Sequence, residues 1–341
     1  MRRIVAVGSG PAVRGHTERY ARFDDAVLVG VVGGDPTAEG DDSTAEGGGV
    51  EDDGDRDGDG DVERYESVAQ ALESAAIDGV DVCGPGAAHG DAVDAALDAD
   101  VPVRCDPPFA LDETRLDRLV SRAAASDGWL LTASPHRHSR LYGHLRSAVE
   151  AGDIGSVGVA RIKRTAPFEP VGWNCSYAGV AAAPTPIDAL CSVLAHDADV
   201  LEWTFGTVGR VFARAQTDAR TDHAHAVLSF RDGGRATVEA TWSGACTPEP
   251  RLEVEYSGDH GRLDFDEHDA STALRNGGGA KRVDPPEDDC RGRLLRAFVE
   301  RLGEEPSSVP GVHPEHPSRV AAAVRRSVDE GRPVALAEES L

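Results

Sequence analysis

Residues 4–10 read Ile4-Val5-Ala6-Val7-Gly8-Ser9-Gly10, an apolar run that stops on Gly-x-Gly. Such a run predicts a buried parallel strand followed by a tight turn and a helix. The two glycines let the backbone approach a pyrophosphate, toward which the helix directs its N–H groups and positive dipole end. The third glycine of G-x-G-x-x-G is replaced by Val13, with Gly15 two residues later. On its own, the turn is compatible with dinucleotide binding or with an ordinary tight turn.

The first third of the chain alternates short apolar runs with helical patterns, which predicts βαβ units and a parallel sheet. The expected strands are 4–7, 26–32, 79–83, 101–104 and 129–132. The clearest expected helices are 67–76, 89–99 and 112–125, the last with Asp112 and Glu113 as a start signal. We therefore expect an α/β fold whose N-terminal domain, residues 1–126, is a Rossmann dinucleotide-binding domain.

Beyond Gly128 the sequence becomes rich in strand patterns separated by turn residues. The expected strands are 157–165, 208–215, 225–230, 235–242, 251–257 and 262–266, and the expected helices are 142–151, 187–203, 294–302 and 317–330. Turns such as Asp232-Gly233-Gly234 join neighbouring strands. Residues 127–341 are therefore predicted to form a second α/β domain with a mostly antiparallel, open sheet, which would suit a homodimer or homotetramer.

An acidic insert occupies residues 36–63, which are mostly Gly, Asp and Glu. It offers too little apolar surface to offset the entropy of ordering, so we expect it to be disordered. Asp53-Gly54-Asp55-Arg56-Asp57-Gly58 resembles the start of a calcium-binding EF-hand loop, but Arg64 stands where the bidentate Glu belongs. A solvated acidic linker is the favoured interpretation, and no metal site is expected.

The formal charge is −25, from 60 acidic and 35 basic residues. At ~1 M salt the Debye length is only about 3 Å, so such self-repulsion would be screened. The composition therefore predicts a halophilic protein of the cytoplasm, and the sign of the charge disfavours nucleic acid. An acidic surface that steers a cationic partner is less favoured, because the carboxylates spread over the whole chain.

No apolar run approaches the ~20 residues of a membrane span, and residues 1–3 lead into a strand rather than a secretory leader. We expect no membrane partner. The six cysteines are scattered without the spacing of a zinc site and are expected to be reduced and mostly buried. They are Cys83, Cys105, Cys175, Cys191, Cys246 and Cys290.

Several further motifs occur in a fixed order along the chain. They are Gly8-Ser9-Gly10 with His16, Gly84-Pro85-Gly86-Ala87-Ala88-His89, Cys105-Asp106-Pro107-Pro108-Phe109-Ala110-Leu111, Arg137, Ala151-Gly152-Asp153-Ile154-Gly155, Gly172-Trp173, His196-Asp197-Ala198-Asp199 and Glu330-Gly331-Arg332-Pro333-Val334. Together with the order of elements, they resemble the Gfo/Idh/MocA oxidoreductases, the group of glucose-fructose oxidoreductase and inositol dehydrogenase. The resemblance covers nearly the whole chain outside the acidic insert.

This resemblance implies that the Rossmann domain holds NAD or NADP and that the second domain presents a small-molecule substrate to the nicotinamide. A secondary alcohol of a sugar or cyclitol would then be oxidised by hydride transfer while a base removes the hydroxyl proton. The implied cofactor contacts are Gly8, Ser9, Gly10, Pro85, His89 and Asp106. The implied substrate contacts are Arg137, Trp173, Ser192 and Asp199.

The catalytic positions depart from the family pattern. The family's Glu-Lys-Pro falls on Asp106-Pro107-Pro108, so Pro107 replaces the lysine. The family's Asp-x-x-x-His pair falls on Ser192 and His196, so His196 remains the acid/base candidate. Asp188 lies one turn before Ser192 on the same helix face and is a second catalytic candidate, either through a Ser192 relay or by aligning substrate. Alternatively, Asp188 is a first-turn acid that favours the helix dipole.

Two questions stay open at this point. The substitutions at positions 107 and 192 allow a noncatalytic nucleotide or ligand binder as an alternative to the enzyme. The ribose-binding acid expected after the second strand falls on Gly33, followed by Gly34 and Asp35, with no arginine placed to receive a 2′-phosphate. The residues therefore do not distinguish NAD from NADP.

Overall fold

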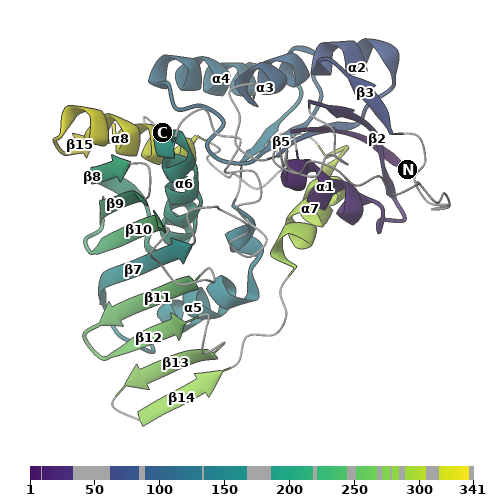
Figure 1. The fold of residues 1–341 in the computed structure, drawn as a ribbon. Helices are drawn as coiled ribbons and strands as arrows, with labels where there is room; N and C mark the ends of the chain where they lie inside the picture. The colour runs from purple at the N-terminus through teal and green to yellow at the C-terminus, as the bar shows by residue number, and fades with distance from the viewer. Residues whose placement is uncertain are drawn as a thin grey trace, which may run out of the picture.

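Six strands form a parallel sheet in the order β3-β2-β1-β4-β5-β6 (Figure 1). They are β1 Arg2–Val7, β2 Ala26–Val32, β3 Glu63–Tyr65, β4 Gly79–Val82, β5 Val103–Cys105 and β6 Leu130–Thr132. Ile4, Val5 and Ala6 are fully buried, as expected for a strand covered on both faces. The strand order is that of a doubly wound dinucleotide-binding domain, so the prediction of a Rossmann fold is confirmed.

The computed structural model describes most of the 341 residues. The described ranges are 1–8, 10–33, 62–83, 89–132, 134–166, 186–217, 221–243, 251–266, 271–276, 279–283, 289–304 and 315–337. Most of the predicted acidic insert lies outside them, as does the EF-hand-like stretch at residues 53–58. β3 begins at Glu63, within the predicted insert.

Helices cover both faces of this sheet (Figure 1). On one face, α2 Val68–Ser74, α3 His89–Asp98 and α4 Glu113–Ala125 pack their apolar sides against the strands. The side chain of Asp112 accepts a hydrogen bond from the N–H of Arg115, which confirms the predicted start of α4. On the other face lie α1 Gly10–Tyr20 and α7 Cys290–Arg301.

The position of α7 crosses the predicted domain boundary. This helix follows the second sheet in sequence, yet Phe298 packs edge-to-face on Trp129 with ring centroids 5.6 Å apart, in the same core as Ile4 and Val13. β6 likewise pairs with β5, so the first sheet continues past residue 126. The N-terminal core therefore includes residues that a boundary at 126 assigns to the second domain.

Nine strands form the second sheet, in the order β14-β13-β12-β11-β7-β10-β9-β8-β15. They are β7 Val157–Ala166, β8 Val208–Thr217, β9 Thr221–Phe230, β10 Arg235–Ser243, β11 Arg251–Gly258, β12 Gly261–Asp266, β13 Ser271–Asn276, β14 Gly279–Val283 and β15 Val334–Ala335. Only the β7–β10 pairing is parallel among these described strands, so the prediction of a mostly antiparallel sheet is confirmed.

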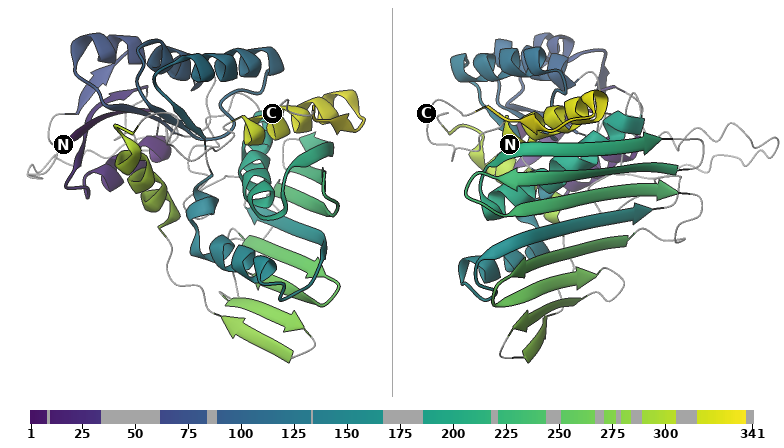
Figure 2. Two further views of the ribbon diagram at one scale, coloured as in Figure 1. Left: turned by 180° about the vertical axis from the view of Figure 1, so that it is seen from behind. Right: turned by 90° about the vertical axis from the view of Figure 1, so that its left-hand side faces the viewer.

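One face of the second sheet is packed against α5 Arg140–Glu150, α6 Pro186–Phe205 and α8 His316–Glu330. Figure 2 shows the opposite face, on which none of the described helices lies. The short 3-10 helix η1, Pro135–His138, follows β6 and leads into α5. It packs against both α6 and α7 and so links the two cores.

Among the described residues, no helix is long and apolar enough to cross a bilayer, and no cluster of His, Cys, Asp and Glu side chains is arranged to hold a metal ion. The four described cysteines are Cys83, Cys105, Cys191 and Cys290, all buried free thiols. This agrees with the expectation for those four.

Candidate active site

The turn between β1 and α1 brings two backbone segments into close contact. A Cβ on Gly8 would lie 2.7 Å from the carbonyl oxygen of Cys83, and a Cβ on Gly33, where φ is +115°, would lie 2.3 Å from the carbonyl oxygen of Gly8. Only glycine allows the ends of β1, β2 and β4 to approach this closely. Ser9 lies outside the described residues.

Gly10 is the first residue of α1. Its φ is +55°, and a Cβ added there would meet no atom of the described residues within 4 Å. The first turn of α1 holds no acidic residue, so the helix N-terminus keeps its positive potential. The residues present therefore fit the pyrophosphate of a dinucleotide, which a side chain at position 10 would displace.

Replacing Gly10 by leucine is expected to weaken NAD(H) binding by about tenfold or more, because the side chain fills the space above the turn. Gly152→Leu is the matched control, since Gly152 also has a left-handed φ, +76°, and a Cβ added to it would likewise meet none of the described atoms within 4 Å. Both variants carry the same left-handed backbone penalty of about 1–2 kcal/mol. Calorimetry should show lost affinity only for Gly10→Leu, and equal affinities would contradict the assignment.

A buried ionic network lies behind the turn. The carboxylate of Asp81 on β4 accepts hydrogen bonds from Arg104 Nη1 at 2.8 Å and from the Tyr20 hydroxyl at 3.0 Å, and lies 2.6 Å from His16 Nδ1. Arg104 also pairs with Asp106. Burial opposes ionisation of Asp81, but His16 and Arg104 hold its pKa well below the usual value. Burial lowers the pKa of His16 to about 4. Asp106 thus faces inward and belongs to this network.

His89 starts α3 at the carboxyl edge of the sheet, where ligands bind in open α/β folds. Its side chain is buried, which lowers its pKa to about 4, and it hydrogen-bonds the backbone of Pro108. Within the described part of the chain, its Nδ1 has no hydrogen-bond partner. A neutral imidazole with one unsatisfied nitrogen suits contact with a polar cofactor group. Pro85, on the preceding segment, lies outside the described residues.

His196 lies on α6 and is buried at the junction with η1. Its Nδ1 is 3.2 Å from the Ser134 hydroxyl, and its ring centroid is 6.1 Å from that of His136. Burial, followed by the charges of Arg291, Arg104 and Arg164, lowers the pKa of His196 well below 6.5. The imidazole is therefore neutral at neutral pH, which is the form that accepts a proton.

A second buried pair lies beside His196. Arg164 on β7 forms a fork with Asp197, with Nε 2.9 Å from Oδ2 and Nη2 2.6 Å from Oδ1. Its Nη2 also lies 3.2 Å from His136 Nε2. The pair holds α6, β7 and η1 together around His196.

Replacing Arg164 by methionine is expected to lower the free energy of unfolding by about 3–5 kcal/mol, because Asp197 is left as a buried, uncompensated charge. Arg161→Met is the control, since Arg161 is exposed on the same strand and pairs with Glu239 at 3.4 Å. That exposed pair should contribute less than about 1 kcal/mol. Urea unfolding of both variants measures the difference, and similar losses would contradict the assignment.

Arg137 and Asp199, predicted as substrate contacts, pair with each other. Arg137 Nε and Nη2 lie 2.9 and 2.6 Å from the two oxygens of Asp199. The N–H of Ser134 also donates to Asp199 at 2.9 Å. Asp199 is fully buried, so its carboxylate fixes η1 and, through Ser134, the ring of His196.

The hydrogen bonds of Ser192 are not those of the predicted relay from Asp188 to His196. The Ser192 hydroxyl donates its proton to the backbone carbonyl of Asp188 at 3.0 Å rather than to the carboxylate. The Asp188 carboxylate pairs with Arg325 on α8. A hydroxyl back-bonded to its own helix cannot also pass that proton along the face. Catalytic participation of Asp188 stays a prediction.

Trp173, the remaining predicted substrate contact, lies outside the described residues.

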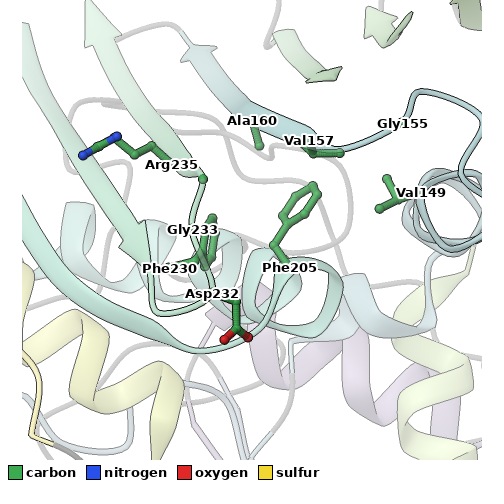
Figure 3. Close-up of a pocket in the computed structure, with 10 residues that line it drawn as sticks. Val149, Gly155, Val157, Ala160, Phe205, Phe230, Asp232, Gly233 and Arg235 are labelled. Atoms are coloured by element: carbon green, nitrogen blue, oxygen red, sulfur yellow. The ribbon is translucent and has the colours of Figure 1, made fainter. Parts of the chain in front are cut away.

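A separate pocket of about 260 Å³ opens beside the turn between β9 and β10 (Figure 3). Phe205 at the end of α6 and Phe230 at the end of β9 contribute aromatic walls, and Asp232 and Arg235 lie at its edge. It contains none of the predicted site residues. It is therefore distinct from the junction around His196.

Two family models match the chain. The oxidoreductase family with an NAD-binding Rossmann fold matches residues 2–133, and the GFO/IDH/MocA C-terminal domain matches residues 142–264. The chain belongs to the GFO/IDH/MocA family. The resemblance found in the sequence is thereby confirmed, and the β1–α1 turn is that of an NAD-binding Rossmann domain.

Several known proteins are similar to this chain over nearly its full length. A myo-inositol 2-dehydrogenase of Thermotoga maritima is 25% identical over 370 residues, covering 98% of this chain and 99% of the relative. Biliverdin reductase of Synechocystis, solved with biliverdin and NADP+, has a TM-score of 0.73 at 19% identity over 96% of this chain and 99% of its own. UDP-N-acetylglucosamine 3-dehydrogenase of Acidithiobacillus ferrooxidans has a TM-score of 0.70 at 21% identity, over 96% of this chain and 98% of its own. The two structures share the fold, and their different named substrates show that the fold leaves the substrate open.

Proposed function

We propose that this GFO/IDH/MocA protein is an NAD(P)-dependent oxidoreductase that acts on the CH–OH group of a sugar-like or cyclitol-like substrate. The observation that carries the proposal is His196, a buried and neutral imidazole fixed by Ser134 in a chain whose first domain belongs to the NAD-binding family. The similarity to a myo-inositol 2-dehydrogenase supports a polyhydroxylated substrate.

Different residues would bind the cofactor and accept the proton during alcohol oxidation. Gly8, Gly10 and the N-terminus of α1 would hold the pyrophosphate, and His89 would contact the cofactor at the sheet edge. Bound NAD+ or NADP+ supplies the hydride acceptor. His196 takes the hydroxyl proton, and Ser134 and Asp199 keep its ring in place. Gly33 at the end of β2 offers no carboxylate for a ribose hydroxyl, so both cofactors are candidates.

The test is a steady-state screen of sugars and cyclitols with NAD+ and NADP+ at ~1 M salt, where the acidic surface is screened. Formation of reduced nicotinamide with one of these substrates is the expected result, and it should drop sharply in His196→Ala. No turnover with any substrate, together with tight NAD(H) binding by calorimetry, would replace this proposal with the noncatalytic binder. That second function is favoured by one observation, the loss of both family side chains at Pro107 and Ser192.

We further propose that the protein works in a salt-rich cytoplasm. The support is the charge of −25, which is unfavourable to the compact state unless counterions screen it. Raising KCl from ~0.1 to ~1 M shortens the Debye length from about 10 to 3 Å, so the melting temperature should rise by several degrees, with each kcal/mol worth roughly 2–4 °C. A melting temperature that is independent of KCl would contradict the proposal.

A homodimer or homotetramer is also proposed, on the open face of the second sheet (Figure 2). Light scattering at high salt should give a mass of two or four chains. A single-chain mass would contradict it.

A further inference from the structure

We propose that Arg291 on α7 is a positioning residue for the reaction, a cation that the C-terminal part of the chain brings between His16 on α1 and Asp106, on a helix fixed to the η1 segment beside His196. This inference rests on the proposed function for the role of His196 as proton acceptor. Pro107 carries no charge, so α7 would supply the positive charge that the family lysine has at this position.

The contacts of Arg291 place its guanidinium between α1 and Asp106. The residue is 4% exposed, and Nη1 lies 2.5 Å from His16 Nε2 and 3.4 Å from Asp106 Oδ2. His16 lies on α1, the helix that begins at Gly10, and Asp106 directly precedes Pro107. Arg291 therefore links α1, the helix that follows the dinucleotide-binding turn, to Asp106. Asp106 is next to Pro107, which replaces the family lysine.

The same helix is fixed to the segment that holds His196. Arg293 donates two hydrogen bonds, at 2.8 and 2.5 Å, to the carbonyl oxygen of His138 at the end of η1. Ser134, which contacts His196, directly precedes η1. A shift of α7 would therefore move Arg291 and the support of His196 together.

Groups on four neighbouring elements act on His196. The charges of Arg291 on α7, Arg104 on β5 and Arg164 on β7 lower its pKa, and the His136 ring on η1 lies beside it. After burial, Arg291 has the largest effect of the three cations in lowering the pKa of His196. A cation here keeps the imidazole in the neutral form that accepts a proton, but it also makes the imidazole a weaker base. The same cation would favour the negative charge that develops on the reacting hydroxyl oxygen, and this second effect is the one by which Arg291 would raise kcat.

The first test uses the protein without cofactor or substrate. Histidine NMR titration of Arg291→Gln should show the pKa of His196 raised by about 1 unit, because a nearby cation no longer opposes protonation. The His196 signal is assigned by its loss in His196→Gln. Arg296→Gln is the control, since Arg296 lies on the same helix and pairs with Asp25 at the surface. An unchanged His196 titration in Arg291→Gln, with the fold intact by circular dichroism, would overturn the proposal.

The second test uses turnover. Arg291→Gln should lower kcat by about tenfold or more and move the acid limb of the kcat/KM profile to higher pH, whereas Arg291→Lys should retain much of both properties. Adding Pro107→Lys to Arg291→Gln should restore part of kcat, because it returns a cation beside Asp106. A purely structural role would lower thermal stability while leaving the pH profile in place, and would overturn the proposal. If the substrate screen finds no turnover, the proposed function fails, while the NMR titration still decides the effect of Arg291 on His196.

Discussion

Replacing His196 by glutamine is expected to lower kcat by about 10²–10⁴-fold, the contribution typical of a positioned general base. Glutamine keeps a hydrogen-bonding side chain of similar size next to Ser134 but accepts no proton. The affinity for NAD(H) should change little, since Gly8 and Gly10, the proposed pyrophosphate contacts, lie at the β1–α1 turn and not on α6. Steady-state kinetics and calorimetry on the same preparation separate the two effects.

The control for His196→Gln is His144→Gln, because His144 is exposed on α5. Wild-type activity should fall as the pH drops through the pKa of His196, and that pKa is lowered by burial and three arginines. The acid limb should therefore lie well below about pH 6.5. Full turnover by His196→Gln would show that another group takes the proton.

Acidification is expected to destabilise the protein before its carboxylates titrate. Burial lowers the pKa of His16 and of His89 from 6.5 to about 4 in each case. The folded state then binds fewer protons than the unfolded state, so this stability is present above the unfolded pKa and is lost as the pH falls from about 6.5 to about 4. Each histidine contributes about 3 kcal/mol over that range, a large share of the 5–15 kcal/mol typical of a folded protein.

Urea unfolding at a series of pH values between about 7.5 and 4.5 measures this loss. Each histidine should add up to about 1.4 kcal/mol per pH unit to the slope, so His16→Gln should make the slope shallower by about that amount. His144→Gln, at an exposed position on α5, is the control for the substitution itself. A free energy of unfolding that is flat between about pH 6.5 and 4.5 would show that these imidazoles are accessible to protons in the folded state.

Local patterns predicted most of the two sheets. The apolar run before Gly8 becomes the central strand β1, and Asp112 caps α4, because both signals depend on neighbours in sequence. The placement of α7 on the first sheet depends instead on contacts such as Phe298 with Trp129, which are far apart in the chain. The edge strands β14 and β15, and β13 next to β14, also carry too little pattern to be predicted from periodicity.

The candidate site was found only in part from the sequence. The position of His196 came from its motif, whereas its hydrogen-bond neighbour Ser134 and the cation Arg291 come from other elements and leave no local signal. Arg164 did leave one, because it occupies the inward-facing alternate position of β7 together with Ala160 and Ile162. A charged residue on the buried face of a strand predicts a buried partner, which the structure identifies as Asp197.

A crystal structure of the protein with bound NADH would show whether the cofactor and His196 share one site. We expect the pyrophosphate to lie over Gly8 and Gly10 at the N-terminus of α1 and the nicotinamide ring to face His196. A dinucleotide bound elsewhere, or a His196 ring turned away from the nicotinamide, would contradict it.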